Sequence, residues 1–320
     1  HEACWNLRDS QESKKIRPFG TNTHEYGSQD QHTNQSCFIC NNIHSLCKSS
    51  RFGGKPNNYF KSEWFFDSME GSHLLAELTK ESENRITFDQ TLPEGINTWQ
   101  VIQALANRLD RNQTYTIRFV EPKIVCDFKK TLEQPLPITG LEFGENYPLT
   151  SDMIDTINII RPKLTRLVVH NQKTEESVFN KISLPELLYL DISRCSKLHD
   201  AVEGIAKSSN MIHVNLSSTS ITDQAVELLA QNLILLKELN LRNTSITEKS
   251  LQKICQVCTH LQSLNLALCT KIDTTACKLI SESAPKLQHL KIPCHWLQCD
   301  SLGQLKSSRP DITIIEGSEL

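Results

Sequence analysis

The sequence predicts an α/β solenoid, with parallel strands on a concave face and helices on a convex face. Three observations lead to this fold: a recurring phrase, a nearly fixed step between its copies, and a change from strand to helix spacing within each copy. The phrase begins at Leu187, Met211, Leu236, Leu261 and Leu287, and the steps between these positions are 24, 25, 25 and 26 residues. Chance does not produce five copies in register, so the repeat is the main architectural unit.

Each copy contains one strand and one helix. In the third copy Leu239 and Leu241 alternate about Asn240, so a strand directs both leucines to one face and the asparagine to the other. Residues 246–255 then have apolar spacings of three and four, which predict a helix with Thr247 as its cap. The phrase Leu-x-x-Leu-x-Leu-x-x-Asn/Cys at this period defines a leucine-rich repeat, whose units bury a continuous core only by stacking.

Weaker copies extend the repeat toward the amino terminus. They begin at Thr114, Ile138 and Leu164, and steps of 24, 26 and 23 residues lead through them to Leu187. We therefore predict that the solenoid spans residues 84–320, with the clearest repeats at 187–292. Its first strand is expected at 85–88 and its last at 312–315. The segment 120–137 fits no predicted element.

The amino-terminal residues 1–58 contain few apolar side chains, so we expect this segment to be flexible and disordered. Within it, three cysteines and one histidine could provide four tetrahedral zinc ligands. They are Cys37, Cys40, His44 and Cys47. Their spacing is tighter than that of the usual zinc knuckle, and the favoured alternative is incidental cysteines. We therefore expect no metal and no cofactor.

Two segments before the clear repeats each allow two interpretations. Residues 59–83 are rich in aromatic and leucine side chains, and we expect an apolar cap that covers the open end of the core. The alternative is an interaction helix for a partner subunit. The stretch from Leu92 to Leu105 resembles the opening of an F-box, but the later features of that module are missing. We favour a convex helix of an early repeat at 98–109.

Charge and cysteine placement limit the classes of function. The net charge is −3 and no run of eighteen apolar residues occurs, so neither nucleic-acid binding nor a membrane span is indicated. Of the twelve cysteines, Cys195 and Cys269 fall in turns, and Cys255 and Cys277 lie on helices facing the core. Buried free thiols fit a reducing compartment, so we expect a cytoplasmic or nuclear protein. The chain opens with His1 instead of Met, so we expect a piece of a longer protein.

The sequence also indicates the subtype of the repeat. Each strand is followed by Cys or Thr and then by a phrase close to Ile-Thr-Asp, as in Thr219-Ser-Ile-Thr-Asp223 and Thr244-Ser-Ile-Thr-Glu248. These units resemble the cysteine-containing leucine-rich repeats of F-box proteins. The resemblance implies substrate recognition for a cullin-type ubiquitin ligase, with a ligase adaptor subunit as a further partner. Thr244 is expected to satisfy backbone groups in its turn.

No catalytic arrangement is visible in the sequence. It has no glycine-rich phosphate loop, no His-Glu-x-x-His and no Gly-x-Ser-x-Gly. Cys294 and His295 are adjacent, but neighbours on one strand point to opposite faces, so they cannot form a thiol–imidazole pair there. We therefore expect that the protein is not an enzyme.

The residues that flank the inward leucines are expected to form the concave binding face. Because they alternate with buried positions, they fall into columns across neighbouring strands. We predict that a protein partner contacts Tyr189, Asp191, His213, Asn215, Glu238, Asn240, Arg242, Asn265, His289 and Lys291. A polar face of mixed charge suits a protein and not a nucleic acid. The alternatives are a solvated face without a partner and a scaffold that joins two proteins outside any ligase.

Overall fold

The computed structural model describes residue 66 and residues 68–79, 84–89, 92, 96–120, 127–145, 147–170 and 173–317. The described residues divide into two units, one up to Glu77 and the other from Leu78 onward. Helix α3 (Met69–Leu78) begins near the end of the first unit, where Ser68 Oγ accepts a hydrogen bond from Gly71 N. The amino-terminal segment 1–58 and its cysteine cluster lie outside the described residues, and the capping role of 59–83 stays a prediction.

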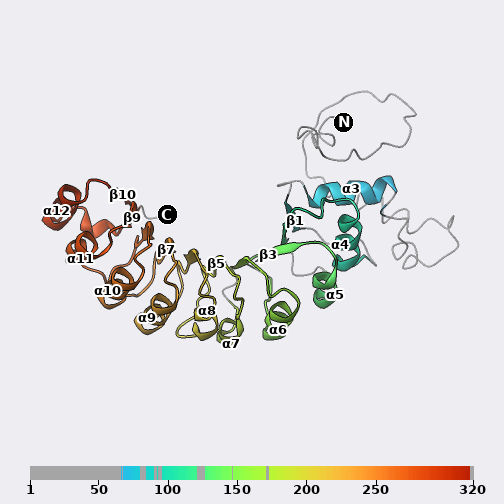
Figure 1. The fold of residues 1–320 in the computed structure, drawn as a ribbon, viewed down its shortest axis with the longest axis horizontal. Coiled ribbons are helices and arrows are strands. Elements are labelled where there is room, and N and C mark those ends of the chain that lie inside the picture. The colour runs from blue at the N-terminus through green and yellow to red at the C-terminus, as the bar shows by residue number, and fades with distance from the viewer. Residues whose placement is uncertain are drawn as a thin grey trace, which may run out of the picture. The chain divides into compact units, whose positions relative to one another are not determined.

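The second unit contains one open sheet in which the strands follow their sequence order from β1 to β10 (Figure 1). Every neighbouring pair is parallel. Strands cross to the next parallel strand through a connection that usually contains a helix, as stacked repeats require. The strands are β1 (Arg85–Phe88), β2 (Tyr115–Phe119), β3 (Ile138–Phe143), β4 (Arg166–Val169), β5 (Tyr189–Asp191), β6 (His213–Asn215), β7 (Glu238–Asn240), β8 (Ser263–Asn265), β9 (His289–Ile292) and β10 (Thr313–Glu316).

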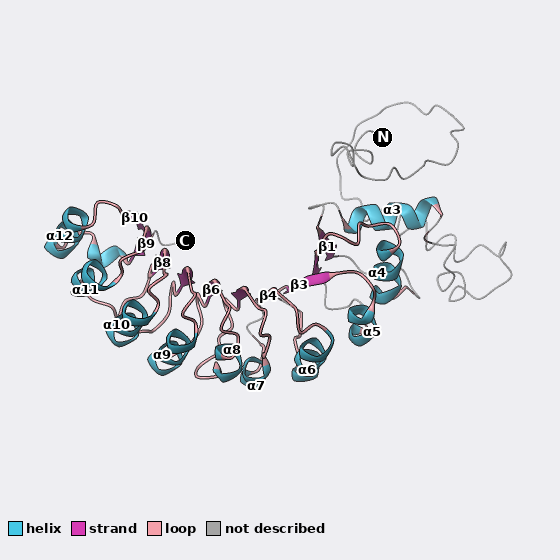
Figure 2. Cartoon of the chain, viewed as in Figure 1, coloured by secondary structure: helices cyan, strands magenta, loops and turns pink. Residues whose placement is uncertain are grey.

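One helix follows each strand of this unit up to β9 and lies on the convex side, as Figure 2 shows for α6 to α12. The helices are α4 (Thr98–Ala106), α5 (Phe128–Glu133), α6 (Ser151–Ile160), α7 (Glu176–Lys181), α8 (Glu203–Ala206), α9 (Asp223–Asn232), α10 (Glu248–Val257), α11 (Ala276–Ser283) and α12 (Asp300–Ser308). The predicted solenoid is confirmed. The interpretation of residues 98–109 as the convex helix of an early repeat is also confirmed, because α4 connects the paired strands β1 and β2.

The turn after each regular strand places a residue in the left-handed region of backbone space. The φ angles are 65° at Arg194, 56° at Ser218, 55° at Asn243 and 62° at Leu268. The next residue is the buried Cys or Thr of the repeat. Thr244 Oγ1 donates to the Leu241 carbonyl oxygen at 2.7 Å, and Cys269 Sγ donates to the same oxygen from the following repeat at 3.0 Å. The predicted role of Thr244 is confirmed, and cysteine at this place links neighbouring repeats.

Threonine caps link the repeats at the helix amino termini. Thr247 Oγ1 accepts a hydrogen bond from Lys249 N at 3.3 Å and donates to Asp223 Oδ2 of the preceding repeat at 2.7 Å. The same link joins Thr222 to Asp200 and Thr275 to Glu248. The Ile-Thr-Asp phrase is therefore a device for stacking: its threonine caps one helix and its carboxylate binds the next repeat. The cap predicted at Thr247 is confirmed.

The core behind the sheet changes character along the solenoid. At one inward position β1, β2 and β3 carry Phe88, Phe119 and Phe143, with successive ring centroids 5.7 and 5.6 Å apart. Leu241 and Leu266 take the equivalent place after β7 and β8, and both are fully buried. Aromatic side chains bury more area than leucine, so the amino-terminal repeats have a bulkier core.

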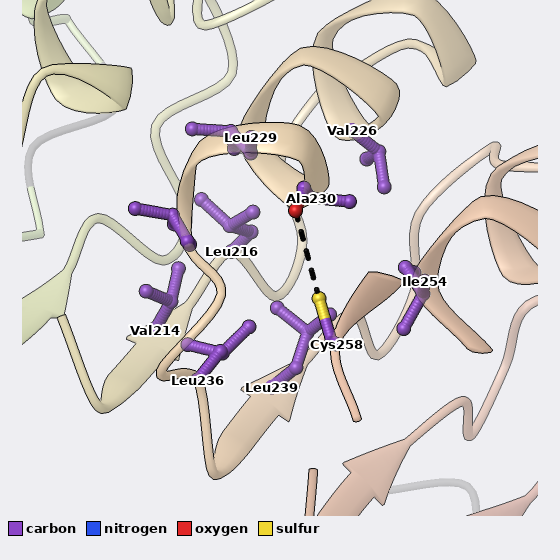
Figure 3. A pocket seen from close by; sticks show the side chains of 10 residues that line it. Val214, Leu216, Val226, Leu229, Ala230, Leu236, Leu239, Ile254 and Cys258 are labelled. Atoms are coloured by element: carbon purple, nitrogen blue, oxygen red, sulfur yellow. Dashed lines mark hydrogen bonds between the residues drawn. The ribbon is translucent and has the colours of Figure 1, made fainter. Parts of the chain in front are cut away.

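A small cavity lies in the core between strands β6 and β7 and helices α9 and α10 (Figure 3). It is lined by Val214, Leu216, Val226, Leu229, Ala230, Leu233, Leu236, Leu239, Ile254 and Cys258. Cys258 Sγ lies 3.9 Å from the carbonyl oxygen of Ala230. A lining of aliphatic side chains offers a ligand nothing to orient it, so we interpret the cavity as a packing gap.

Two details differ from the sequence-based predictions. Helix α5 occupies part of the segment 120–137, where no element was predicted. Cys294 and His295 do not lie on a strand but in a 3-10 helix, Cys294–Trp296, so the strand argument was wrong. Cys294 Sγ donates to Gly317 O at 2.8 Å, and His295 Nε2 lies 2.9 Å from Ile272 O. Both groups thus have backbone partners, and neither activates the other.

Candidate functional site

The sheet register aligns the predicted site residues across the concave face. One column runs through Tyr189, His213, Glu238, Ser263 and His289, and the next runs through Asp191, Asn215, Asn240, Asn265 and Lys291. The residues between them, Leu190, Val214, Leu239, Leu264 and Leu290, are buried. The structure therefore brings nine of the ten predicted residues together in these two columns, and the tenth, Arg242, lies in the turn after β7. Their binding role stays a prediction.

Four of these residues hold the turn that ends each strand. Asn240 Oδ1 accepts a hydrogen bond from Arg242 N at 3.0 Å. The same bond joins Asp191 to Ser193, Asn215 to Ser217 and Asn265 to Ala267, at 3.0, 3.1 and 3.0 Å. A short polar side chain that bonds the backbone two residues on is an Asx turn, which fixes the local chain path. This ladder of Asx turns has a structural task that the sequence analysis did not assign to it.

Several of the predicted residues also interact with each other across strands. His213 Nδ1 lies 3.1 Å from Glu238 Oε2, and the rings of Tyr189 and His213 lie 6.0 Å apart. Asn215 Nδ2 donates to Asp191 Oδ2 at 2.9 Å. These contacts join β5, β6 and β7 into a continuous polar surface. Further along the face, His289 and Lys291 of β9 are exposed.

Asp191 is the most buried carboxylate of this surface. Its Oδ1 atom lies 3.2 Å from His170 Nε2, at the end of β4. Burial alone would raise the pKa of Asp191, but interactions with His170 and Ser193 outweigh it and lower the pKa below its ordinary value. The carboxylate therefore stays charged, with its oxygens directed at neighbouring groups of the protein.

A second group of charged residues, which the sequence-based predictions did not include, lies on the concave face of β1 to β4. Glu142 of β3 is buried, and its Oε1 atom accepts a hydrogen bond from Arg166 Nε of β4 at 2.9 Å. Arg85 Nη2 of β1 donates to the same oxygen at 3.4 Å. Arg118 Nε of β2 lies 4.0 Å from Glu142 Oε2. We call Arg85, Arg118, Arg166 and Glu142 the arginine cluster.

The surroundings of the arginine cluster fix its geometry. The Arg166 guanidinium stacks over the Tyr189 ring, with 3.8 Å between Cζ and the ring centroid. An irregularity in the pairing of β2 with β3 shifts the register beside Thr116. Gly140 of β3 lies directly against Thr116, where a Cβ atom would come within 2.3 Å of Thr116 Oγ1. A larger residue at Gly140 would therefore disturb the sheet beside the cluster.

One signal in the sequence could have found the arginine cluster. Arg118 stands between Ile117 and Phe119, as Asn240 stands between two buried leucines. The alternation that assigns faces in the regular repeats applies to these weaker ones as well. It places Arg118 and Glu142 in the column of Asp191, and Arg85 and Arg166 in the column of Tyr189.

Other kinds of site are not supported by the described residues. Among them, no three His, Cys, Asp or Glu side chains come together in a way that could hold a metal ion. Burial raises the pKa of Cys255 and Cys277 to about 12 and that of Cys258 to about 11. A thiol in this range is a poor nucleophile at neutral pH. No helix in the described part of the chain is long and apolar enough to cross a bilayer.

Comparisons with known proteins come from one family model and from solved structures. Residues 257–281 match the family model described as Leucine Rich repeat. Curated proteins give no match. An internalin, inlF from Listeria monocytogenes, is 15% identical with a TM-score of 0.40, over 59% of this chain and 53% of the internalin. The chain thus spans about half the length of that internalin.

Two further solved structures are similar over more of the chain. LegL7, a leucine-rich repeat-containing protein from Legionella pneumophila, is 18% identical with a TM-score of 0.48, over 78% of this chain and 90% of LegL7. A chain of the yeast Rad7 and Elc1 complex is 12% identical with a TM-score of 0.38, over 88% of this chain and 92% of that chain.

The chain is a leucine-rich-repeat protein. Its registered repeats, its ten-stranded parallel sheet and the match at residues 257–281 establish the class. Proteins of this class present a curved array of strands and helices that serves protein–protein interaction. Fold alone does not name the partner, which depends on the side chains of the concave face.

Proposed function

We propose that the protein recognises a protein partner through the concave face of its solenoid. The observation that carries the proposal is the arginine cluster, where charged side chains from four neighbouring strands meet on one face. Arg118 and Glu142 occupy the register positions that carry the Asx residues in the later repeats, and Arg85 and Arg166 flank them in the column of Tyr189. Charged side chains arranged across several strands, with an aromatic ring beside them, suit recognition of another protein.

The mixed charge of the face favours a protein over a nucleic acid. Glu142, Asp191 and Glu238 project from the same face as the arginines. A phosphate backbone that followed the sheet would meet these carboxylates at intervals. A protein partner can place charges of either sign opposite them, which also provides specificity.

Site-specific crosslinking tests which face binds. A photoreactive benzoylphenylalanine would replace Tyr189 or Ser263 on the concave strands, and Gln252 or Gln256 on the exposed side of α10 as the matched control. We expect irradiation in cell extract to give one and the same protein adduct from the concave positions and none from α10. Adducts from α10 alone would place the binding surface on the convex side.

The resemblance of the repeats to those of F-box proteins supports a finer proposal. The bound protein would be a substrate that the solenoid holds for a cullin-type ubiquitin ligase. The alternative is a scaffold that joins two proteins without a ligase. Affinity purification of the protein from cells separates the two, because the first requires a cullin and its adaptor among the bound proteins and the second requires their absence.

A further inference from the structure

We infer that the arginine cluster binds an acidic segment of the protein partner, with Arg85 and Arg166 pairing its carboxylates. This inference rests on the proposed function, because it assigns a chemistry to the partner of the same concave face. It moves the main contact from the regular repeats, where the sequence analysis placed it, to strands β1 to β4.

The charge balance of the cluster leaves Arg85 and Arg166 able to bind an anion. The Arg85 and Arg166 guanidinium groups share one carboxylate oxygen, Glu142 Oε1. The Glu142 side chain is only 9% exposed, whereas those of Arg85 and Arg166 are 34% and 33% exposed. The guanidinium groups of Arg85 and Arg166 each have five N–H donors, so one bond to Glu142 leaves most of them for a ligand. The buried carboxylate orients Arg85 and Arg166 and can neutralise only one of them.

Preorganisation adds to this capacity. Arg166 is fixed from two sides, by Glu142 at its Nε atom and by the Tyr189 ring under its guanidinium plane. An arginine that is already ordered loses less side-chain entropy when it binds. Between Arg85 and Arg166 the same column carries only Thr116 and Gly140, which are small. An extended peptide can therefore approach both guanidinium groups closely.

The neighbouring strands limit the size of the acidic segment. Beyond β4, the sheet carries carboxylates in both columns. Asp191 is the residue next to Val168 on β5, and Glu238 of β7 lies two strands beyond Tyr189. Like charges opposite each other cost binding energy, so the acidic part of the ligand must end near β4. Strands lie about 4.8 Å apart, so four strands accommodate only a few acidic residues. This favours a short acidic peptide segment over a long polyanion.

The test uses the full chain and a fluorescein-labelled hexaglutamate peptide, with hexaglutamine as the neutral probe. We expect saturable binding of hexaglutamate by fluorescence anisotropy, which weakens as salt screens the charges, and no binding of hexaglutamine. The double variant Arg85→Gln/Arg166→Gln should bind hexaglutamate at least about tenfold more weakly, because two charge-assisted contacts are lost. Lys207→Gln/Lys271→Gln, an equal charge change at exposed positions, serves as the control and should bind like the parent.

A second variant separates binding from folding. The double variant leaves Glu142 with fewer partners, so it could unfold locally. Arg85→Gln/Glu142→Gln/Arg166→Gln removes that buried charge too and should retain the parent's circular dichroism spectrum while it still loses hexaglutamate binding. The single variant Glu142→Gln keeps the arginines and frees them from their internal carboxylate, so it should bind the peptide more tightly than the parent.

The outcomes are distinct. Equal binding by the parent and the folded triple variant overturns the inference, and so does an oligothymidylate that binds the arginines more tightly than hexaglutamate. If hexaglutamate fails to bind while the concave crosslinks are obtained, this inference is wrong and the proposed function stands. If crosslinks form only from α10, the proposed function fails, whatever the peptide result.

Discussion

The two halves of the solenoid use the same register positions for different tasks. In the regular half, strands β5 to β8 are three residues long and four Asx side chains bond their own backbone. In the irregular half, strands β1 to β4 are four to six residues long, and the equivalent places carry Thr87, Arg118, Glu142 and Val168.

The difference indicates which repeats of such a protein are free to carry a binding function. A repeat that keeps its consensus polar residues uses them to form the turn, so their outward position does not make them binding residues. A repeat that departs from the consensus lacks the Asx side chain that forms this turn, and its outward position can carry a different polar or charged side chain. Arg118 and Glu142 occupy such places, and a stacked phenylalanine core supports the strands beneath them.

The largest expected effect comes from a charge in the regular core. Leu241 is fully buried, so Leu241→Asp would bury an unpaired carboxylate and cost more than about 4 kcal/mol. Because each repeat contacts mainly its neighbours, we expect β6 to β8 to lose hydrogen-exchange protection first. Protection equal to that of the parent in these strands would mean that the leucines are wrongly assigned to the buried face.

A cavity in the irregular core should cost nearly as much. Phe119 is fully buried and its ring stacks between Phe88 and Phe143. Phe119→Ala should lower the free energy of unfolding by about 3–5 kcal/mol. Phe119→Leu is the milder control and should lose less. Urea denaturation measures both, and an alanine variant as stable as the parent would show that the phenylalanine stack contributes little.

The turn role of the Asx ladder predicts a smaller loss. Asn240→Ala removes the acceptor for Arg242 N, and we expect a loss of about 1–2 kcal/mol. Asn240→Asp retains an acceptor oxygen and should stay close to the parent in melting temperature. Equal losses in both variants would indicate that Asn240 stabilises the protein through something other than this turn.

The smallest expected effect is a gain. Leu268 has a φ angle of 62°, a conformation that asparagine tolerates better than leucine and that Asn243 adopts at the same place. Leu268→Asn should therefore raise stability by about 1 kcal/mol. Asn243→Leu is the reverse change and should lower it by a similar amount. Calorimetry measures both, and a loss in Leu268→Asn would contradict the account of this turn.

The sequence predicted the repeat, the inward leucines and the columns of the regular half, because alternation and period are carried by neighbouring residues. It did not predict α5, a short helix in a segment without clear periodicity. The alternation correctly placed Asn240 on the concave face, but it could not show that the Asn240 side chain bonds back to Arg242 N. Arg85 and Glu142 are 57 positions apart in the sequence, so no local pattern could predict their hydrogen bond.

The most direct test of the account is to map where an acidic ligand binds. A hexaglutamate peptide with a terminal benzophenone would be irradiated with the full chain, and the labelled fragments identified by mass spectrometry. We predict labels on fragments that contain β1 to β4 and their loss in Arg85→Gln/Glu142→Gln/Arg166→Gln. Labels confined to fragments of β5 to β9, and unchanged in that variant, would contradict it.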